Sequence, residues 1–182
     1  VLAKDMGAVV GAHAENAEVV NSLQEKFISE GKTGPEWHER SRPDSVEADG
    51  TNHFCAFAEV TGAKAYIVHL SCERALKNAV NAKLNGTDMT IEAVLPHLLL
   101  DYTYAELPDF EGAKYVLSPP LRRKKDQDAL WAGLKSGIIS TVGTDHAPFN
   151  TTQKLMGKDA FNTIPNGIPA IEDRVPMLYT KG

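Results

Sequence analysis

Short apolar segments alternate with amphipathic segments along this chain, and no other feature constrains its fold as strongly. Residues 8–13 form the first apolar segment, which we interpret as a buried strand, and Val20, Leu23 and Phe27 then recur at helical spacing as far as Gly31. The same pattern predicts further strands at 65–69, 89–94 and 138–142, and further helices at 50–61, 72–85 and around 130–136. Parallel strands need crossover connections, so strands alternating with helices predict an α/β fold with a parallel sheet.

Composition and charge exclude several classes of protein. The chain has 182 residues, enough for one domain with a core, and 19 basic residues against 24 acidic ones give a net charge of −5. No basic block is present, so nucleic acid and anionic membranes are not expected partners. No apolar run approaches the roughly 20 residues of a membrane span. Cys55 and Cys72 form neither a C-x-x-C pair nor a disulfide framework, which favours a soluble cytoplasmic protein.

Three ionisable residues follow predicted strands directly, and they suggest a site. His13, His69 and Asp145 each stand at the carboxyl end of an expected strand, which is the edge where parallel α/β folds place their sites. Imidazole and carboxylate groups suit zinc and other first-row metals, and a carboxylate can accept a proton from metal-bound water. Each residue also has a simpler interpretation, since a histidine after a strand is often structural and Asp145 could cap a turn.

Five sequence motifs together resemble the dihydropyrimidinase and hydantoinase family of the metal-dependent amidohydrolase superfamily. They occur in the family's order and span most of the chain, and residues 40–43 (RSRP) resemble a loop of the same family. The motifs are VGAHAEN at 10–16, YIVHLS at 66–71, LSPPLR at 117–122, GTDHAPF at 143–149 and IPNGIP at 164–169.

This resemblance implies a (β/α)8 TIM-type barrel, of which the chain would contain only about strands five to eight. Residues 1–182 would then be a partial catalytic barrel domain, without its upstream half and its C-terminal remainder, and the absence of an initial Met agrees with a fragment. The family's His-x-His pair, the carboxylated lysine that bridges its two metals and a substrate-contacting tyrosine would lie upstream. Lys4 does not replace that lysine, because it precedes the first strand instead of ending one.

The resemblance also implies roles for individual residues. His13 and His69 would bind one of two divalent metal ions, expected to be Zn²⁺, and Asp145 would bind the other and act as general base. Ser118 and Asn166 would hold the ring amide of the substrate through backbone groups, although such residues in Pro- and Gly-rich turns usually serve turn geometry.

The remaining histidines receive weaker interpretations from the sequence. His146 is either close to the metals or exposed, and His97 is interpreted as structural although it could contribute to the site. His38 and His53 receive no role.

The implied activity of the parent enzyme is metal-dependent hydrolysis of a cyclic amide, a hydantoin or a dihydropyrimidine, by a homo-oligomer that is a tetramer in relatives. The fragment alone is expected to be inactive. Dihydroorotase and allantoinase are alternatives, since they share the metal scaffold and the motif at residues 117–122. A non-catalytic dihydropyrimidinase-related scaffold protein is the alternative of another class, and the presence of His13, His69 and Asp145 argues against it.

Overall fold

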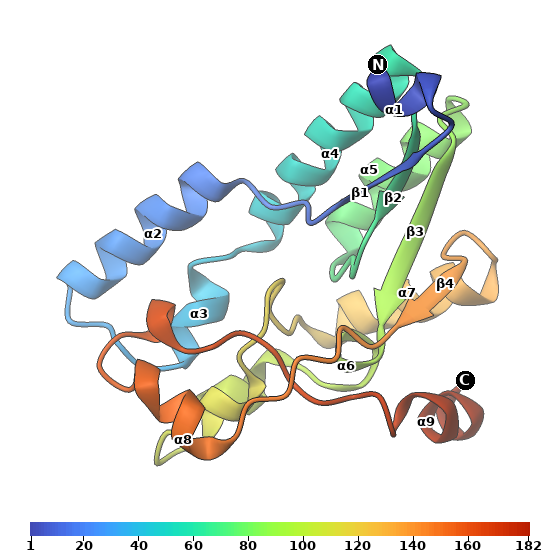
Figure 1. The fold of residues 1–182 in the computed structure, drawn as a ribbon. Helices are drawn as coiled ribbons and strands as arrows, with labels where there is room; N and C mark the ends of the chain where they lie inside the picture. The colour runs from blue at the N-terminus through green and yellow to red at the C-terminus, as the bar shows by residue number, and fades with distance from the viewer.

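The four strands form one parallel sheet whose spatial order follows the chain. A computed structural model describes residues 1–182, with strands β1 (Val9–Ala12), β2 (Lys64–Ile67), β3 (Met89–Val94) and β4 (Thr141–Gly143) in the order β1-β2-β3-β4. Each neighbouring pair is parallel, so every strand ends at the same edge of the sheet (Figure 1). The α/β class with a parallel sheet is confirmed.

Helices connect these strands, and three of them pack their apolar sides against one face of the sheet. Helices α4, α5 and α7 pack together there, and α4 and α5 make the largest helix–helix contact (Figure 1). The nine α-helices are α1 (Leu2–Asp5), α2 (Ala17–Ser29), α3 (Glu36–Arg40), α4 (Asp44–Thr61), α5 (Glu73–Leu84), α6 (Leu95–Leu99), α7 (Lys124–Lys135), α8 (Thr151–Lys154) and α9 (Arg174–Lys181). Short 3₁₀ turns occur at 102–106, 111–115, 155–157 and 161–163.

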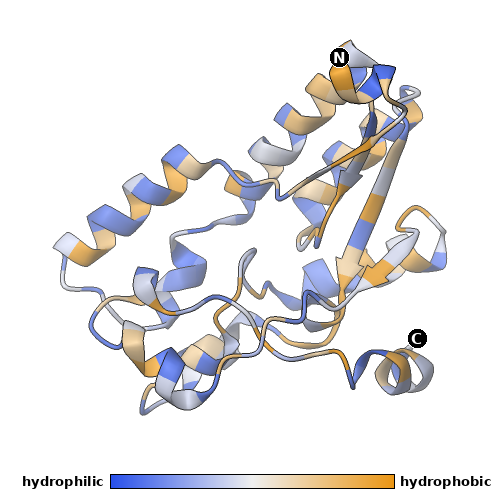
Figure 2. Cartoon of the chain, viewed as in Figure 1, coloured by the Kyte–Doolittle hydropathy of each residue, from blue (hydrophilic) through white to orange (hydrophobic).

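The main core lies between the sheet and these helices. Alternate residues of the central strands, such as Ile67 and Ile91, point toward α4 and α5 and are buried with small residues such as Ala75 and Ala79. Small side chains let the helices approach the sheet closely, and the remaining positions of the same strands carry polar groups, including Tyr66 and Glu92. Figure 2 shows the resulting mixture of apolar and polar positions along the helices.

Several predicted details need correction. The first strand is not buried: Val9 is 56% exposed and Val10 is 39% exposed, because β1 is an edge strand paired only with β2. The fourth strand begins at Thr141 and not at residue 138, since Ile138 and Ile139 pack beside α5 and α7 in the turn before it. The helix predicted at 50–61 is α4, which begins earlier, at Asp44, directly after Pro43.

A thiol caps the N-terminus of α5. The Sγ atom of Cys72, and not the hydroxyl of Ser71, accepts the cap hydrogen bond of α5 from the Ala75 N–H. Ser71 instead bonds to the carboxylate of Glu47.

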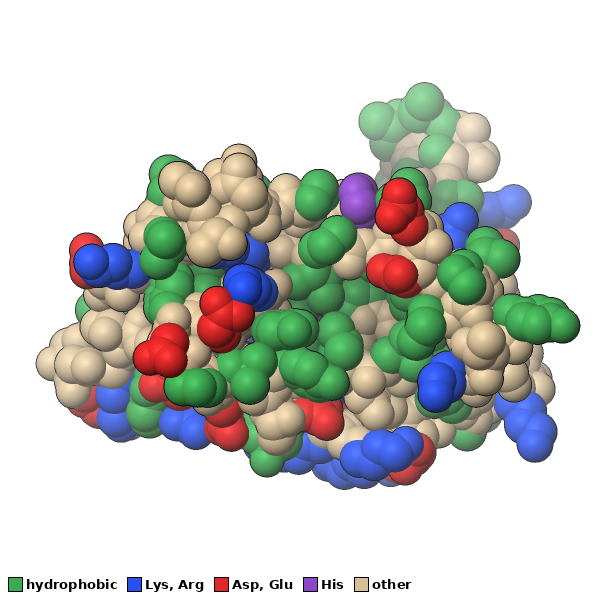
Figure 3. Space-filling view, turned by 90° about the horizontal axis from the view of Figure 1, so that it is seen from below, with side chains coloured by type: hydrophobic (Ala, Val, Ile, Leu, Met, Phe, Trp, Pro, Cys, Tyr) green, Lys and Arg blue, Asp and Glu red, His purple; other side chains and the backbone are tan.

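Apolar side chains are exposed on the face of the molecule that lies at the bottom of Figure 1. Figure 3 shows green side chains gathered over the middle of this face. An apolar groove is lined by residues of α6, α9, the turn at 102–106 and the segment between α8 and α9. Among the helices, none combines the length and apolar character that a membrane crossing requires.

Candidate metal and substrate site

The carboxyl ends of β1 and β2 bring two of the predicted metal ligands together. His13 follows β1 directly and His69 lies two residues beyond β2, and Nδ1 of His13 is 3.1 Å from Nε2 of His69. The two rings meet edge to face with their centroids 4.8 Å apart. Two histidines that follow different strands therefore bring one nitrogen each within hydrogen-bond distance of the other.

This geometry fits two ligands of one metal ion. Two imidazole nitrogens that bind one tetrahedral zinc ion at about 2.0–2.1 Å are themselves about 3.3 Å apart. Ligation also needs neutral imidazole. Burial, together with the neighbouring charge of His13, lowers the pKa of His69, which favours that neutral form.

A buried carboxylate contacts the ring nitrogen of His13 that does not face His69. Glu15 Oε2 lies 2.7 Å from His13 Nε2 and 2.5 Å from an Arg42 guanidinium nitrogen, and only 2% of the Glu15 side chain is exposed. Burial alone would raise the pKa of Glu15, but the hydrogen bond with His13 and the charge of Arg42 lower it overall. A carboxylate on the second ring nitrogen is the usual partner of a metal-binding histidine, and here it leaves Nδ1 on the side that faces His69.

Asp145 lies at the same edge but stands apart from the two histidines. It follows β4, is exposed and forms no side-chain hydrogen bond, yet its charge is near enough to act on the pKa of His69. No three His, Cys, Asp or Glu side chains of this chain come together closely enough to hold a metal ion. Residues 1–182 thus present two ligands side by side and a third carboxylate at a distance.

Two of the three predicted ligands have unusual backbone conformations. His69 has φ of +40° and Asp145 has φ of +46°, in the left-handed region that non-glycine residues rarely adopt. Such strain persists only where the surroundings enforce it, and it clusters at functional sites. The observation supports a functional interpretation of both positions.

Glu92 holds the backbone of His69 in this conformation. The side chain projects from β3, and Oε1 accepts a 3.0 Å hydrogen bond from the His69 N–H while Oε2 accepts a 2.8 Å bond from the Tyr66 hydroxyl. Tyr66 in turn lies 3.0 Å from the Thr141 hydroxyl on β4. The polar face of the sheet therefore positions His69 through three strands.

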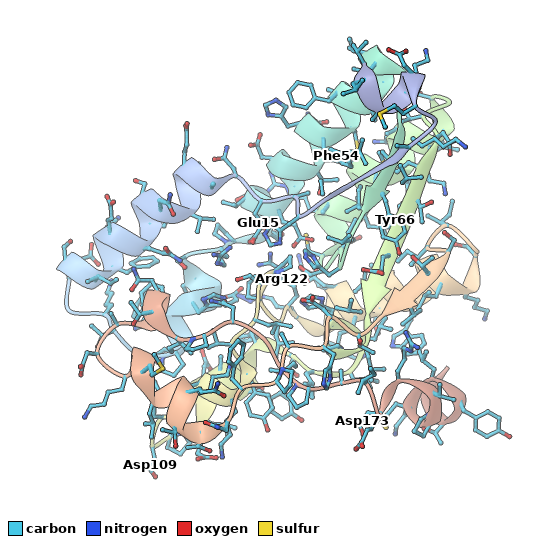
Figure 4. All side chains as sticks on the ribbon, in the orientation of Figure 1. Glu15, Phe54, Tyr66, Asp109, Arg122 and Asp173 are labelled. Carbon is cyan, nitrogen blue, oxygen red and sulfur yellow. The ribbon has the colours of Figure 1, made fainter.

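A buried ion pair lies under the loop that carries His69. Arg122 donates to Glu47 Oε2 at 2.8 Å and to the Ser71 hydroxyl at 3.0 Å, and both charged side chains are 3% exposed. A further guanidinium nitrogen donates to the Arg42 carbonyl, which connects this pair to the residue that contacts Glu15. Figure 4 shows Glu15 and Arg122 near one another, between the N-terminal helices and the loops below them.

The two predicted substrate residues are also brought together. The Ser118 hydroxyl donates a 2.9 Å hydrogen bond to Asn166 Oδ1, although 48 residues separate them. The backbone N–H and C=O of both residues form no hydrogen bond within the chain. The predicted substrate groups are therefore free to bind a ligand.

The other histidines are distributed as follows. His146 is exposed and its Nδ1 accepts hydrogen bonds from the N–H groups of Ala170 and Ile171, so it orders a loop. His38 and His97 are buried and bond to the carbonyls of Leu117 and Pro119. His53 is exposed on α4.

Sequence reasoning missed several residues that shape the site, namely Glu15, His38, Glu47, Glu92, Arg122 and Lys154. Glu15, two residues after His13, gave a usable signal, because a carboxylate next to a ligand histidine is a common orienting group. The others gave no local signal, since their partners lie 11 to 80 residues away in the chain.

Comparison with known proteins finds hydantoinases over the whole length of this chain. D-hydantoinase of Geobacillus stearothermophilus is 43% identical over 183 residues, which cover 100% of this chain and 39% of the relative. The solved D-hydantoinase (dihydropyrimidinase) of Thermus sp. superposes with a TM-score of 0.98 at 61% identity, over 100% of this chain and 40% of that protein. A dihydroorotase structure from Campylobacter jejuni shares the fold alone, with a TM-score of 0.65 and 14% identity over 97% of this chain and 41% of that protein. No family model matches the chain.

The parallel sheet, its helical layer and the residues at its carboxyl edge define part of a metal-dependent amidohydrolase barrel. Within that class, the chain belongs to the hydantoinase/dihydropyrimidinase family. It spans about two fifths of the length of the curated relatives it matches.

Proposed function

We propose that residues 1–182 supply strands five to eight of a cytoplasmic cyclic amidohydrolase that opens hydantoin or dihydropyrimidine rings. The adjacency of His13 and His69, with their nitrogens 3.1 Å apart, is the observation that carries the proposal. The remaining strands, a His-x-His pair and a carboxylated lysine would come from upstream sequence. The whole enzyme would act as a homo-oligomer, a tetramer as expected for this family.

The chain's own residues have distinct tasks in this reaction. His13 and His69 would hold one of two divalent ions, with zinc the expected metal because imidazole suits it. Bound metal would supply an activated water at neutral pH and would polarise the amide carbonyl. Asp145, exposed at the strand edge, would bind the other ion, take the proton of the attacking water and return it to the leaving ring nitrogen.

The substrate would lie between the motif around Ser118 and the motif around Asn166. A cyclic amide offers one N–H donor and one C=O acceptor side by side, and the free backbone groups of these two residues can satisfy both. A substrate without that pair would leave the free backbone groups of Ser118 and Asn166 unpaired in the complex.

Activity of the full-length, zinc-loaded enzyme on hydantoin and dihydrouracil tests this proposal. Asp145→Asn is expected to lower kcat by a factor of about 100 to 10,000, since general acid–base groups contribute on that scale. Because Asp145 is also the proposed ligand of the second ion, the metal content of the variant is measured with kcat, and a loss of kcat at wild-type metal content would assign the proton-transfer role. Exposed Asp159→Asn, in a turn beyond the site, is the matched control.

Dihydroorotase is the second candidate, because a dihydroorotase shares the fold. The identity to that structure is low, whereas the hydantoinases match at 43% and 61%. A clear preference for dihydroorotate over hydantoin and dihydrouracil would replace the first candidate with the second.

A further inference from the structure

Three buried nitrogen donors hold the backbone on both sides of Ser118. The Val116 carbonyl accepts from Lys154 Nζ at 3.0 Å, and the Leu117 carbonyl lies 2.9 Å from Nε2 of His38. The Pro119 carbonyl lies 2.9 Å from Nε2 of His97. Ser118 is thus the one residue in the segment 116–119 whose carbonyl has no partner in the chain.

The same lysine also holds the backbone on both sides of Asn166. Lys154 Nζ donates to the Pro165 carbonyl at 2.7 Å and to the Gly167 carbonyl at 2.9 Å, while the Asn166 carbonyl has no partner. A hydrogen bond from the Gly167 N–H to the Val116 carbonyl links the two segments directly. One ammonium group therefore fixes two segments that lie far apart in the sequence.

The burial of these donors shows that they serve the backbone. Lys154 is 3% exposed and contacts no carboxylate, so its three carbonyl partners replace water for a buried ammonium group. His38 and His97 are each 2% exposed, and Nδ1 of each ring forms no hydrogen bond. A ring with one bonded nitrogen and one bare nitrogen is the neutral Nε2–H tautomer, which donates to the carbonyl.

We propose that Lys154, supported by His38 and His97, is a positioning residue that presents the free backbone groups of Ser118 and Asn166 to the cyclic amide. This inference rests on the proposed function, because it assumes that the amide binds between these two residues. The three donors come from α8, α3 and α6, so the segment is fixed from three sides. Correct orientation of binding groups is worth large factors in rate and affinity.

Lys154→Met in the full-length, zinc-loaded enzyme tests the role of the ammonium group while it keeps most of the side-chain volume. The KM for hydantoin is expected to rise between about tenfold and about a hundredfold, because a misplacement of about 1 Å carries a cost of that order. A smaller change is expected in kcat, since the backbone contacts hold the substrate and the transition state alike. Zinc content should match the wild type, and exposed Lys158→Met should leave KM unchanged.

A pair of His38 variants provides an independent test if Lys154→Met does not fold. Glutamine can place an amide N–H near the position of Nε2, whereas leucine cannot donate. His38→Leu should therefore raise KM, and His38→Gln should retain most of the wild-type value. Equal KM values for these two variants would overturn the inference.

The outcomes separate this inference from the proposed function. A wild-type enzyme that hydrolyses no cyclic amide would end the proposed function. An active wild type, together with a Lys154→Met variant that loses stability and keeps its KM, would instead leave Lys154 as a structural residue and overturn the positioning role.

Discussion

Glu92 illustrates how a single side chain sets the conformation of a proposed metal ligand. Its carboxylate accepts the backbone N–H of His69, where φ is +40°, and it also accepts the Tyr66 hydroxyl. A backbone held in the left-handed region relaxes when the group that enforces it is removed. His69 would then turn its Nε2 atom away from His13.

Glu92→Leu in the full-length enzyme should therefore weaken metal binding. Loss of groups that support a ligand histidine lowers metal affinity about 10- to 100-fold. Glu92→Gln retains an oxygen acceptor for the His69 N–H and should lose less. Competition with a chelator measures the affinity, and Thr90→Val on the same face of β3 is the control. Equal zinc affinity in Glu92→Leu and the wild type would contradict this role.

The buried histidines predict how stability depends on pH. Burial lowers the pKa of both His38 and His97 from 6.5 to about 3. Between these values the unfolded chain binds a proton at each histidine that the folded chain does not bind. Stability is therefore fully present above pH 6.5 and falls as the pH decreases, with a slope of up to about 1.4 kcal/mol per pH unit for each histidine.

Unfolding by urea between pH 5 and pH 6.5 measures this slope in the full-length enzyme. His97→Gln should reduce the slope by about one proton's contribution, because glutamine does not titrate. His53→Gln, at an exposed position of α4, is the matched control. A slope that His97→Gln leaves unchanged would show that the ring is protonated in the folded state.

At the scale of elements, the Glu47–Arg122 pair joins α4 to the loop before α7 and to the loop that follows β2. Glu47 accepts from the Ser71 N–H and from Arg122, and the pair is almost fully buried. Removal of one partner leaves the other as an uncompensated buried charge, which costs about 3–5 kcal/mol. The double replacement leaves no such charge.

Glu47→Gln and Arg122→Met should therefore each lower the urea midpoint strongly, and the double variant should lose less than the sum of the two. Urea unfolding of the four proteins provides the double-mutant cycle. The exposed pair of Lys124 and Asp128 is the matched control, since such pairs contribute about 0–1 kcal/mol. Additive losses for Glu47 and Arg122 would mean that their contact is energetically neutral.

The elements also show what local sequence determines here. The strands and helices were predictable because the spacing of apolar residues, such as Ile67 and Ile91, is a short-range pattern that differs between the two. Gly31 and Gly137, which follow the ends of their helices, have positive φ. The exposure of β1 was not predictable, because it depends on which strands are neighbours and not on the apolar character of Val9 and Val10.

The candidate site likewise contains residues whose placement the sequence predicts and residues whose placement it does not. His13, His69 and Asp145 could be placed at one edge because parallel strands end together. The positions of Lys154 and Arg122 depend on contacts across at least 38 and 51 residues, apart from the local Lys154 bonds to 165 and 167. The contacts of these two residues could therefore be identified only from the folded structure.

At the scale of the whole molecule, the sheet has two open edges. β1 and β4 each pair with one strand only, and a barrel removes such edges by closing on itself. Edge strands with free N–H and C=O groups tend to pair with other chains. Only two of the proposed ligands are adjacent in this part of the molecule, so the other half of a barrel would supply both the missing strands and the missing ligands.

Residues 1–182 produced alone should therefore bind zinc substoichiometrically, show little hydantoin turnover and associate as their concentration rises. Elemental analysis, turnover assays and sedimentation velocity measure these properties, with the full-length enzyme as the reference. Co-production with the upstream half should restore zinc and turnover together, because closure of the barrel would pair both β1 and β4 and complete the ligand set in one step. Full activity of the isolated piece would show instead that His13, His69 and Asp145 suffice, and the division of the site between two halves would be wrong.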